Sequence, residues 1–299
     1  MSSVAQSRFL TRRRSGSVRS RRRAVAEPLV KAIGYLLISL TAITMLFPFY
    51  WMVSSSLKTE LEIFQVPPKW LPIPPVWENY TYVFKVVNFG LYTYNSMKLG
   101  VLWTVGVVLS SSWAAYGFAR VRFWGRNALF IITLAALMIP GQVTMIPTFI
   151  LMNKLGWVNT HLPLWVPAFF GSAFGIFLMR QYFLTIPQEL LDAAKIDGCS
   201  HFGIYGRIIM PLAQPALASL ALLAFMGSWN NLLGPVIYLY DERLFTLPIG
   251  LTRFQGMYVT YWAYTMAGGT LTVLPILILF LLTQKYFVQG VVLTGLAGR

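Results

Sequence analysis

The chain has 299 residues, of which 57% are apolar and only 11% are charged, whereas soluble proteins average about 45–50% apolar and about 25% charged residues. With a mean hydropathy of +0.62, the chain has too little polar surface to coat a water-soluble globule, so the composition predicts a membrane protein. The composition excludes a disordered chain and a collagen-like repeat. A disulfide scaffold is excluded as well, because Cys199 is the single cysteine.

Residues 1–31 form a basic segment that holds nine of the 24 Lys and Arg residues and one acid, Glu27. A net charge of +15 would point to nucleic acid in a soluble chain. Directly before an apolar run, a basic tail is instead typical of cytoplasmic retention, with anionic membrane lipid as a contact. We therefore predict a cytoplasmic tail over 1–31 and no nucleic-acid partner. A disordered tail without a further role is the alternative.

Six apolar runs are long enough to cross the hydrocarbon core of a bilayer, which takes about 17–25 residues. The first run exceeds the roughly 7–15 residues of a signal-peptide core and should stay in the protein, although the serines at 54–56 leave cleavage open as a minor alternative. We predict an all-α polytopic membrane protein with a six-span domain over 32–285 and a cytoplasmic C-terminal tail over 286–299. The predicted spans are Ala32–Val53, Met97–Phe118, Ala128–Ile150, Leu162–Met179, Met210–Leu233 and Ala263–Thr283.

Charge asymmetry predicts the orientation of these spans. With the N-terminus inside, 17 Lys and Arg residues lie on the cytoplasmic side and seven lie outside, so both termini are expected in the cytoplasm. The outer segment between the first two spans, Ser54–Ser96, contains five prolines in 67–75. Proline cannot donate to a ladder, so we expect an extended, irregular lid there.

All nine acids and both histidines lie outside the predicted spans. Ion-coupled pumps usually keep ionisable groups at membrane depth, so a self-driven pump is not expected. No metal-ligand spacing or catalytic set is available there either, so we do not expect an enzyme. The chain has no phosphate-binding loop and no Gly-Lys dipeptide. Any energy from ATP must then come from another polypeptide.

Helix breakers interrupt several of the predicted spans. Such interruptions are tolerated where protein or a water-filled cavity satisfies the freed backbone groups, which indicates a bundle bent around a pathway. The general abundance of Gly and Pro in membrane helices is the alternative explanation. The interruptions are Pro140-Gly141-Gln142, Pro167 and Gly171, Pro215, and Gly268-Gly269 with Pro275.

The cytoplasmic segment between the fourth and fifth spans, residues 180–209, carries a pattern of its own. Pro187 suits a first helical turn, Glu189 and Asp192 suit its positive end, and Gly198 suits its termination. The spacing predicts a short helix over Pro187–Ile196. One face of it would carry Leu190, Leu191 and Ala194, and another Gln188, Asp192 and Lys195. The adjacent alanines Ala193 and Ala194 would form a shallow surface that another protein could approach closely.

The spacing Pro-x-Glu-x-x-Asp-Ala-Ala-x-x-Asp-Gly over 187–198, followed by Ile209-Met210-Pro211 and Pro215, resembles the EAA loop of ABC importer permeases. Asp192 replaces the usual Glu, and Cys199-Ser200 replaces Ala-Ser or Ala-Thr. The resemblance implies that this helix docks into a cleft of an ATPase subunit; an ordinary amphipathic connector is the alternative. The implied coupling residues are Glu189, Leu190, Asp192, Ala193, Ala194, Asp197, Gly198 and Pro211.

Further pieces, over about 36–290, resemble the carbohydrate-uptake branch of this family, which includes maltose permeases. They are Pro67-Pro68-Lys69-Trp70, Asn79-Tyr80, Trp229-Asn230-Asn231 and the segment 284–290. The resemblance implies a type I, MetI-like fold in a prokaryotic cytoplasmic membrane. It also implies a second related permease subunit, two ATPase subunits and an extracytoplasmic solute-binding protein as partners. The chain itself would need no cofactor, since ATP is used by the ATPase partner.

Sugars are held by aromatic rings and by neutral groups that hydrogen-bond hydroxyls. Candidate pathway residues of these types are Gln142, Ser228, Trp229, Asn230 and Asn231. Asn and Gln also join helices to each other within membranes, which is the alternative for each residue. Two other functions stay open: a self-sufficient facilitator, and an importer of a non-sugar solute such as glycerol phosphate, which cationic cavity residues would indicate.

Overall fold

The computed structural model describes residues 14–256 and 260–296, and the regular structure within these ranges is helical. The all-α class predicted from the sequence is therefore confirmed. The α-helices are α2 (Arg14–Ser56), α3 (Glu60–Ile63), α4 (Glu78–Val86), α5 (Phe89–Arg120), α6 (Arg126–Ala135), α7 (Gly141–Lys154), α8 (Ala173–Thr185), α9 (Gln188–Ile196), α10 (His201–Ile204), α11 (Met210–Leu212), α12 (Gln214–Trp229), α13 (Leu233–Tyr238), α14 (Leu247–Thr252) and α15 (Trp262–Leu296). Single 3₁₀ turns cover Ala136–Met138, Leu162–Leu164, Val166–Phe170 and Glu242–Leu244, and a π turn covers Tyr205–Ile209.

Among the described residues, three helices are long and apolar enough to cross a membrane unbroken, over Val30–Ser56, Phe89–Arg120 and Trp262–Gln284. They contain the first, second and sixth predicted spans. α2 starts at Arg14, within the basic segment 1–31, and residues 1–13 lie outside the described residues. Likewise α15 continues to Leu296, through most of the predicted C-terminal tail, whose residues 297–299 are not described.

The third, fourth and fifth predicted spans are broken, as their helix breakers predicted, although their ends differ from the expected boundaries. The interruption expected in the sixth span is wrong, because α15 runs unbroken through Gly268, Gly269 and Pro275. The third bends by 99° between Arg126–Met138 and Gly141–Lys154, where Pro140 disfavours helix at the residue before it. The fifth begins at Gln214, after a 79° bend from the short helices over His201–Leu212. The fourth is two 3₁₀ turns followed by α8, because Gly171 adopts a φ of +100° and Ser172 caps a new helix by accepting from the Gly175 N–H at 3.3 Å.

The outer segment Ser54–Ser96 is more ordered than the expected irregular lid. Thr59 and Glu62 form a capping box that starts α3, and α4 and the first two turns of α5 also fall within the segment. The longest part of the segment without helix is the proline-rich stretch over 64–77. Asn79 fastens α4 to the chain at the end of α2, because its amide donates to the carbonyl oxygens of Ser56 and Lys58, both at 2.9 Å.

Helix α5 is central to the bundle, with α8 and α12 packed along it. Small residues allow this close approach: a Cβ added at Gly175 of α8 would lie 2.5 Å from the Ser111 Oγ of α5. A Cβ added at Gly106 would lie 2.6 Å from the Phe169 ring. Ser110 adds a hydrogen bond between segments, donating to the carbonyl oxygen of Ala168 at 2.9 Å.

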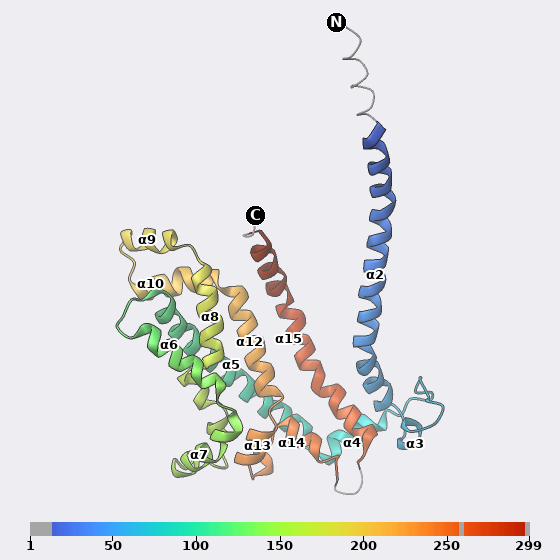
Figure 1. Ribbon diagram of the computed structural model, residues 1–299. Helices are drawn as coiled ribbons and strands as arrows, with labels where there is room; N and C mark the ends of the chain where they lie inside the picture. The colour runs from blue at the N-terminus through green and yellow to red at the C-terminus, as the bar shows by residue number, and fades with distance from the viewer. Residues whose placement is uncertain (1–13, 257–259, 297–299) are drawn as a thin grey trace.

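The elements gather at two ends of the bundle. Figure 1 shows α9 at the same end as the start of α2 and the end of α15, whereas α3, α7, α13 and α14 lie at the other end. α2 stands apart from the bundle along most of its length and approaches α15 near its own C-terminal end. The segment between α8 and α12 therefore lies at the end of the bundle where α2 begins.

Candidate functional site: a coupling segment and a polar cavity

The coupling segment, residues 180–209, contains the helix that the sequence predicts. α9 runs from Gln188 to Ile196 with Pro187 as its N-cap residue, one residue from the expected start. At its other end Gly198 takes a φ of +80°. The N–H of Cys199 donates to the Ala194 carbonyl at 2.9 Å, and that of Gly198 to the Lys195 carbonyl at 3.0 Å. This 6→1 and 5→2 pair is a Schellman motif, which confirms Gly198 as the helix stop.

One apolar edge of α9 packs against other residues of the same chain. Leu191 is 2% exposed and Ala194 is 6% exposed, and both belong to a buried cluster with Ile186 and Ile204. Ala194, which the sequence placed with Ala193 on a surface open to a partner protein, is therefore covered by the permease chain itself. Periodicity marked the edge as apolar, but it could not show that the chain itself covers that edge.

The rest of α9 is solvent-exposed. Apolar Leu190, Ala193 and Ile196 are exposed, and the Ile196 side chain keeps 87% of its surface free. The expected polar face is present, since Asp192 accepts from the Gln188 amide at 2.9 Å and lies 3.6 Å from the Lys195 ammonium. We call the surface formed by Glu189, Ala193, Ile196 and Asp197 the outward face of α9.

Arg120, at the end of α5, holds the start of α9 in place. Its guanidinium donates to the carbonyl oxygens of Phe183 and Ile186, and to the Gln188 Oε1 at 2.8 Å. Sequence reasoning counted Arg120 only as a cytoplasmic charge. Its partners lie 63 to 68 positions away, so no local pattern indicated the contact.

Pro211, the remaining predicted coupling residue, lies in α11, between the π turn over Tyr205–Ile209 and the bend into α12. Its side chain is exposed, whereas its neighbours Ile209 and Ala213 are fully buried. Pro211 therefore lies where the coupling segment turns toward the bundle.

The predicted pathway residues are distributed over different environments. Ser228 and Asn231 line a cavity of about 280 Å³ together with Trp103 of α5 and Ser172 and Phe174 of the α8 start. The Asn231 Oδ1 also accepts from the Gly234 N–H at 3.1 Å. Trp103 was not identified from the sequence, because a tryptophan inside a predicted span carries no local signal that it lines a cavity.

Trp229, Asn230 and Gln142 are not among the residues that line this cavity. Trp229 is 1% exposed, stacks on Phe225 at 5.5 Å between ring centroids, and donates its indole N–H to the Thr272 carbonyl at 3.2 Å. Its indole therefore joins α12 to α15. Asn230 and Gln142 are exposed, on the turn after α12 and on α7 respectively.

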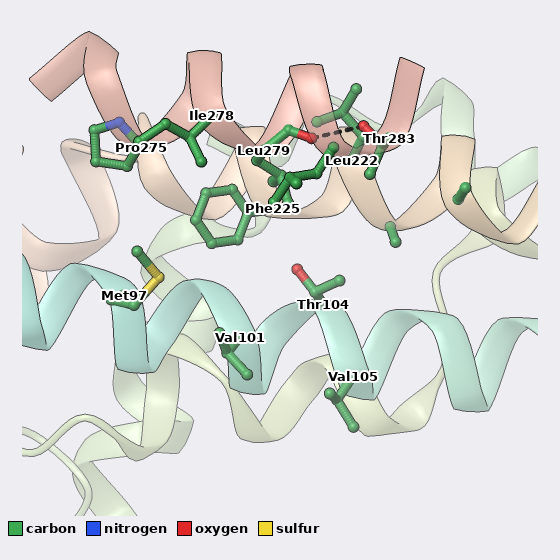
Figure 2. A pocket seen from close by; sticks show the side chains of 13 residues that line it. Met97, Val101, Thr104, Val105, Leu222, Phe225, Pro275, Ile278, Leu279 and Thr283 are labelled. Atoms are coloured by element: carbon green, nitrogen blue, oxygen red, sulfur yellow. Dashed lines mark hydrogen bonds between the residues drawn. The ribbon is translucent and has the colours of Figure 1, made fainter. Parts of the chain in front are cut away.

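A second hollow, of about 510 Å³, lies between α5, α12 and α15. Figure 2 shows that its lining is almost wholly apolar, with Met97 and Val101 on α5, Phe225 on α12 and Leu279 on α15. The Thr104 hydroxyl in its wall is satisfied by its own helix, since it donates to the Gly100 carbonyl at 2.7 Å. This groove therefore offers nothing for a polar solute to bind.

Broken apolar helices, a cavity lined in part by polar side chains and an ordered helix at one end of the bundle fit a membrane transport component. In the described part of the chain no group of three His, Cys, Asp or Glu residues could hold a metal ion. The family described as "Binding-protein-dependent transport system inner membrane component" matches residues 106–293. The chain belongs to this family, whose members are ABC importer permeases, not enzymes, and leave ATP use to a partner ATPase.

Individual relatives agree with this assignment. The arabinooligosaccharides transport system permease protein AraQ of Bacillus subtilis is 37% identical over 257 residues, 85% of this chain and 91% of that protein. The trehalose/maltose transport system permease protein MalG of Thermococcus litoralis is 34% identical, covering 93% of this chain and 100% of that protein. The sn-glycerol-3-phosphate transport system permease protein UgpE of Yersinia enterocolitica is 31% identical, covering 86% and 94%.

A solved structure has the same fold. The crystal structure of a bacterial ABC transporter involved in the import of the acidic polysaccharide alginate contains a chain with a TM-score of 0.76. The match covers 88% of this chain and 98% of that chain, at 24% sequence identity. The MetI-like permease fold expected from the sequence is therefore confirmed.

The end of α9 generates a first prediction. Gly198→Ala should weaken the end of α9, because a left-handed backbone costs an L side chain about 1–2 kcal/mol. We expect hydrogen exchange of the α9 amides to accelerate about 5- to 30-fold. Gly203→Ala is the control, since an added Cβ there meets its first atom at an ordinary 3.7 Å. Equal exchange in the two variants would show that Gly198 does not hold the helix end.

Proposed function

We propose that this chain is the transmembrane permease subunit of an importer for a sugar or oligosaccharide. It would form half of the translocation pathway beside a second related permease. Two ATPase subunits would bind on the cytoplasmic side, and an extracytoplasmic solute-binding protein would deliver the solute. The observation that carries this proposal is the outward face of α9, an ordered surface outside the spans that the chain leaves uncovered.

The outward face has the composition of a docking surface. Ala193 and Ile196 are apolar and exposed, and Glu189 and Asp197 flank them with negative charge. An apolar centre with a charged rim is typical of protein interfaces. Because Leu191 and Ala194 anchor the opposite edge of α9 in the permease, force applied to the outward face reaches the bundle through packed side chains.

Ala193→Arg tests the docking of an ATPase. A long charged side chain there would be buried without a partner in the interface, which costs several kcal/mol. We expect normal membrane levels of the permease, at least about tenfold weaker co-purification of the ATPase, and no uptake. Lys195→Ala on the polar face is the matched control and should be mild.

Ala194→Arg should behave differently, because Ala194 is buried in the permease itself. We expect Ala194→Arg to lower the membrane level of the permease. Comparing the two variants therefore distinguishes a folding defect from a docking defect. If the ATPase co-purifies with Ala193→Arg at the wild-type level, α9 is not the coupling helix.

The chemistry of the cavity supports a neutral, hydroxyl-rich solute. Trp103 offers an aromatic face, and Ser228 and Asn231 offer neutral hydrogen-bonding groups. The residues that line the cavity include no Lys or Arg to neutralise a phosphate. The relatives named for arabinooligosaccharides and for trehalose and maltose support a sugar as the solute. The relative named for sn-glycerol-3-phosphate supports the alternative, a non-sugar solute.

Ser228→Ala tests the pathway. If the Ser228 hydroxyl binds solute, its loss removes a hydrogen bond of about 0.5–1.5 kcal/mol, and uptake should fall about 2- to 10-fold with the complex intact. Ser219→Ala on the same helix is the control, since that hydroxyl donates to the Pro215 carbonyl at 2.9 Å and lies outside the cavity. An equal effect of both serines would argue against the cavity as the pathway.

We further propose that both termini lie in the cytoplasm. The 17 to 7 distribution of basic residues supports this orientation, and so does the position of α9 at the end of the bundle where α2 begins (Figure 1). With Cys199 replaced by Ser, a cysteine at Ile73 should react with an impermeant thiol reagent in intact cells. Cysteines at Ser15 and Gly298 should react only after permeabilisation. Labelling of Ser15 from outside would reverse the orientation.

A further inference from the structure

A line of polar side chains on α5 contacts the coupling segment at successive helical turns. Ser112, Tyr116 and Arg120 are spaced by four residues, so they lie along one face of α5. The Ser112 Oγ lies 2.8 Å from the Tyr205 hydroxyl, and the Tyr116 hydroxyl lies 3.1 Å from the His201 Nδ1. We call Ser112, Tyr116 and Arg120 the α5 stripe.

Arg120 makes the most extensive of these contacts. It donates to two main-chain carbonyl oxygens, those of Phe183 near the end of α8 and Ile186 before α9, and to the Gln188 side chain in the first turn of α9. A guanidinium presents five donors in a planar fork, so one side chain can hold acceptors from several segments at once. Arg120 is therefore the residue of α5 whose hydrogen bonds reach the first turn of α9 directly.

The same helix also forms a wall of the polar cavity. Trp103 and Val107 of α5 line that cavity, and α5 continues without a proline from there to Arg120. At a rise of about 1.5 Å per residue, Val107 and Arg120 lie about 20 Å apart along a continuous helix. A displacement of one end of α5 therefore reaches the other end.

This inference rests on the proposed docking of an ATPase at α9. We propose that Arg120 is a positioning residue that makes α5 and α9 move as one body, so that movement of α9 by the ATPase displaces the α5 wall of the cavity. Tyr116 and Ser112 support the same connection further along α5. Arg120 touches neither solute nor nucleotide; it acts through α9.

The test uses the complete complex in proteoliposomes with its solute-binding protein. For each variant we would measure the ATPase retained, the ATP hydrolysed and the solute imported per assembled complex. Arg120→Ala should retain the ATPase, because the outward face of α9 is unchanged. Stimulation of ATP hydrolysis by the solute-loaded binding protein should fall at least about fivefold, the lower end of typical coupling between sites, and more ATP should be hydrolysed per solute imported.

Two further variants sharpen the result. Arg120→Lys keeps the charge but lacks the planar fork, so it should restore part of the stimulation. Arg122→Ala is the matched control, since Arg122 is exposed and the described structure assigns its side chain no hydrogen bond; it should match the wild type. A purely structural role for Arg120 predicts that Arg120→Ala lowers complex yield while leaving the ATP-to-solute ratio unchanged, and that result would overturn the proposal.

A distance measurement tests the one-body claim without altering Arg120. With Cys199 replaced by Ser, spin labels are placed at Gly117 of α5, where an added Cβ meets no atom within 4 Å, and at exposed Lys195 of α9. The distance between the labels should stay constant when ATP binds to the assembled complex. A change of several ångströms would overturn the inference.

The two proposals fail separately. If Ala193→Arg leaves ATPase binding and uptake intact, the docking at α9 is wrong, whatever Arg120 does. If Ala193→Arg abolishes ATPase binding but Arg120→Ala keeps wild-type stimulation, docking stands and the positioning role of Arg120 falls.

Discussion

α5 can approach α8 and α12 closely only because small residues line the contact. In lipid the hydrophobic effect does not hold one apolar helix against another, so association depends on close packing and on hydrogen bonds between helices. Gly106 and Gly175 leave no room for a side chain, and Ser110 and Ser111 bond to the segment that leads into α8. The polar cavity and the α5 stripe both lie on surfaces of α5 that this packing brings into position.

The coupling segment combines two requirements on one short helix. A helix of nine residues is not stable alone in water, so α9 needs tertiary contacts. Leu191 and Ala194 supply those contacts on one edge, Arg120 holds the first turn, and the Schellman motif satisfies the last carbonyl groups. The outward face is thereby ordered before any partner arrives, which lowers the entropic cost of binding one.

The two hollows of the bundle differ in what they can hold. The cavity beside Ser228 and Asn231 contains hydrogen-bonding groups and an aromatic ring, whereas the groove beside Phe225 is apolar and its threonine hydroxyls bond to their own helix. Trp229 lines neither hollow: its indole N–H donates from α12 to α15, and its ring stacks on Phe225.

The sequence by itself determined what depends on composition and on local geometry. The excess of apolar residues predicted a helical membrane protein, because backbone groups in lipid must be hydrogen-bonded within the segment. Pro187 and Gly198 predicted the limits of α9, because each residue restricts or permits the backbone conformation at its own position. Tertiary structure decided the rest. The helix breakers at Pro140 and Pro215 predicted interruptions, but the size of each bend, 99° and 79°, depends on tertiary packing and appeared only in three dimensions. The contacts of Arg120 join residues at least 63 positions apart, which no local pattern can indicate. The burial of Ala194 depends on which part of the chain covers α9, and periodicity does not carry that information.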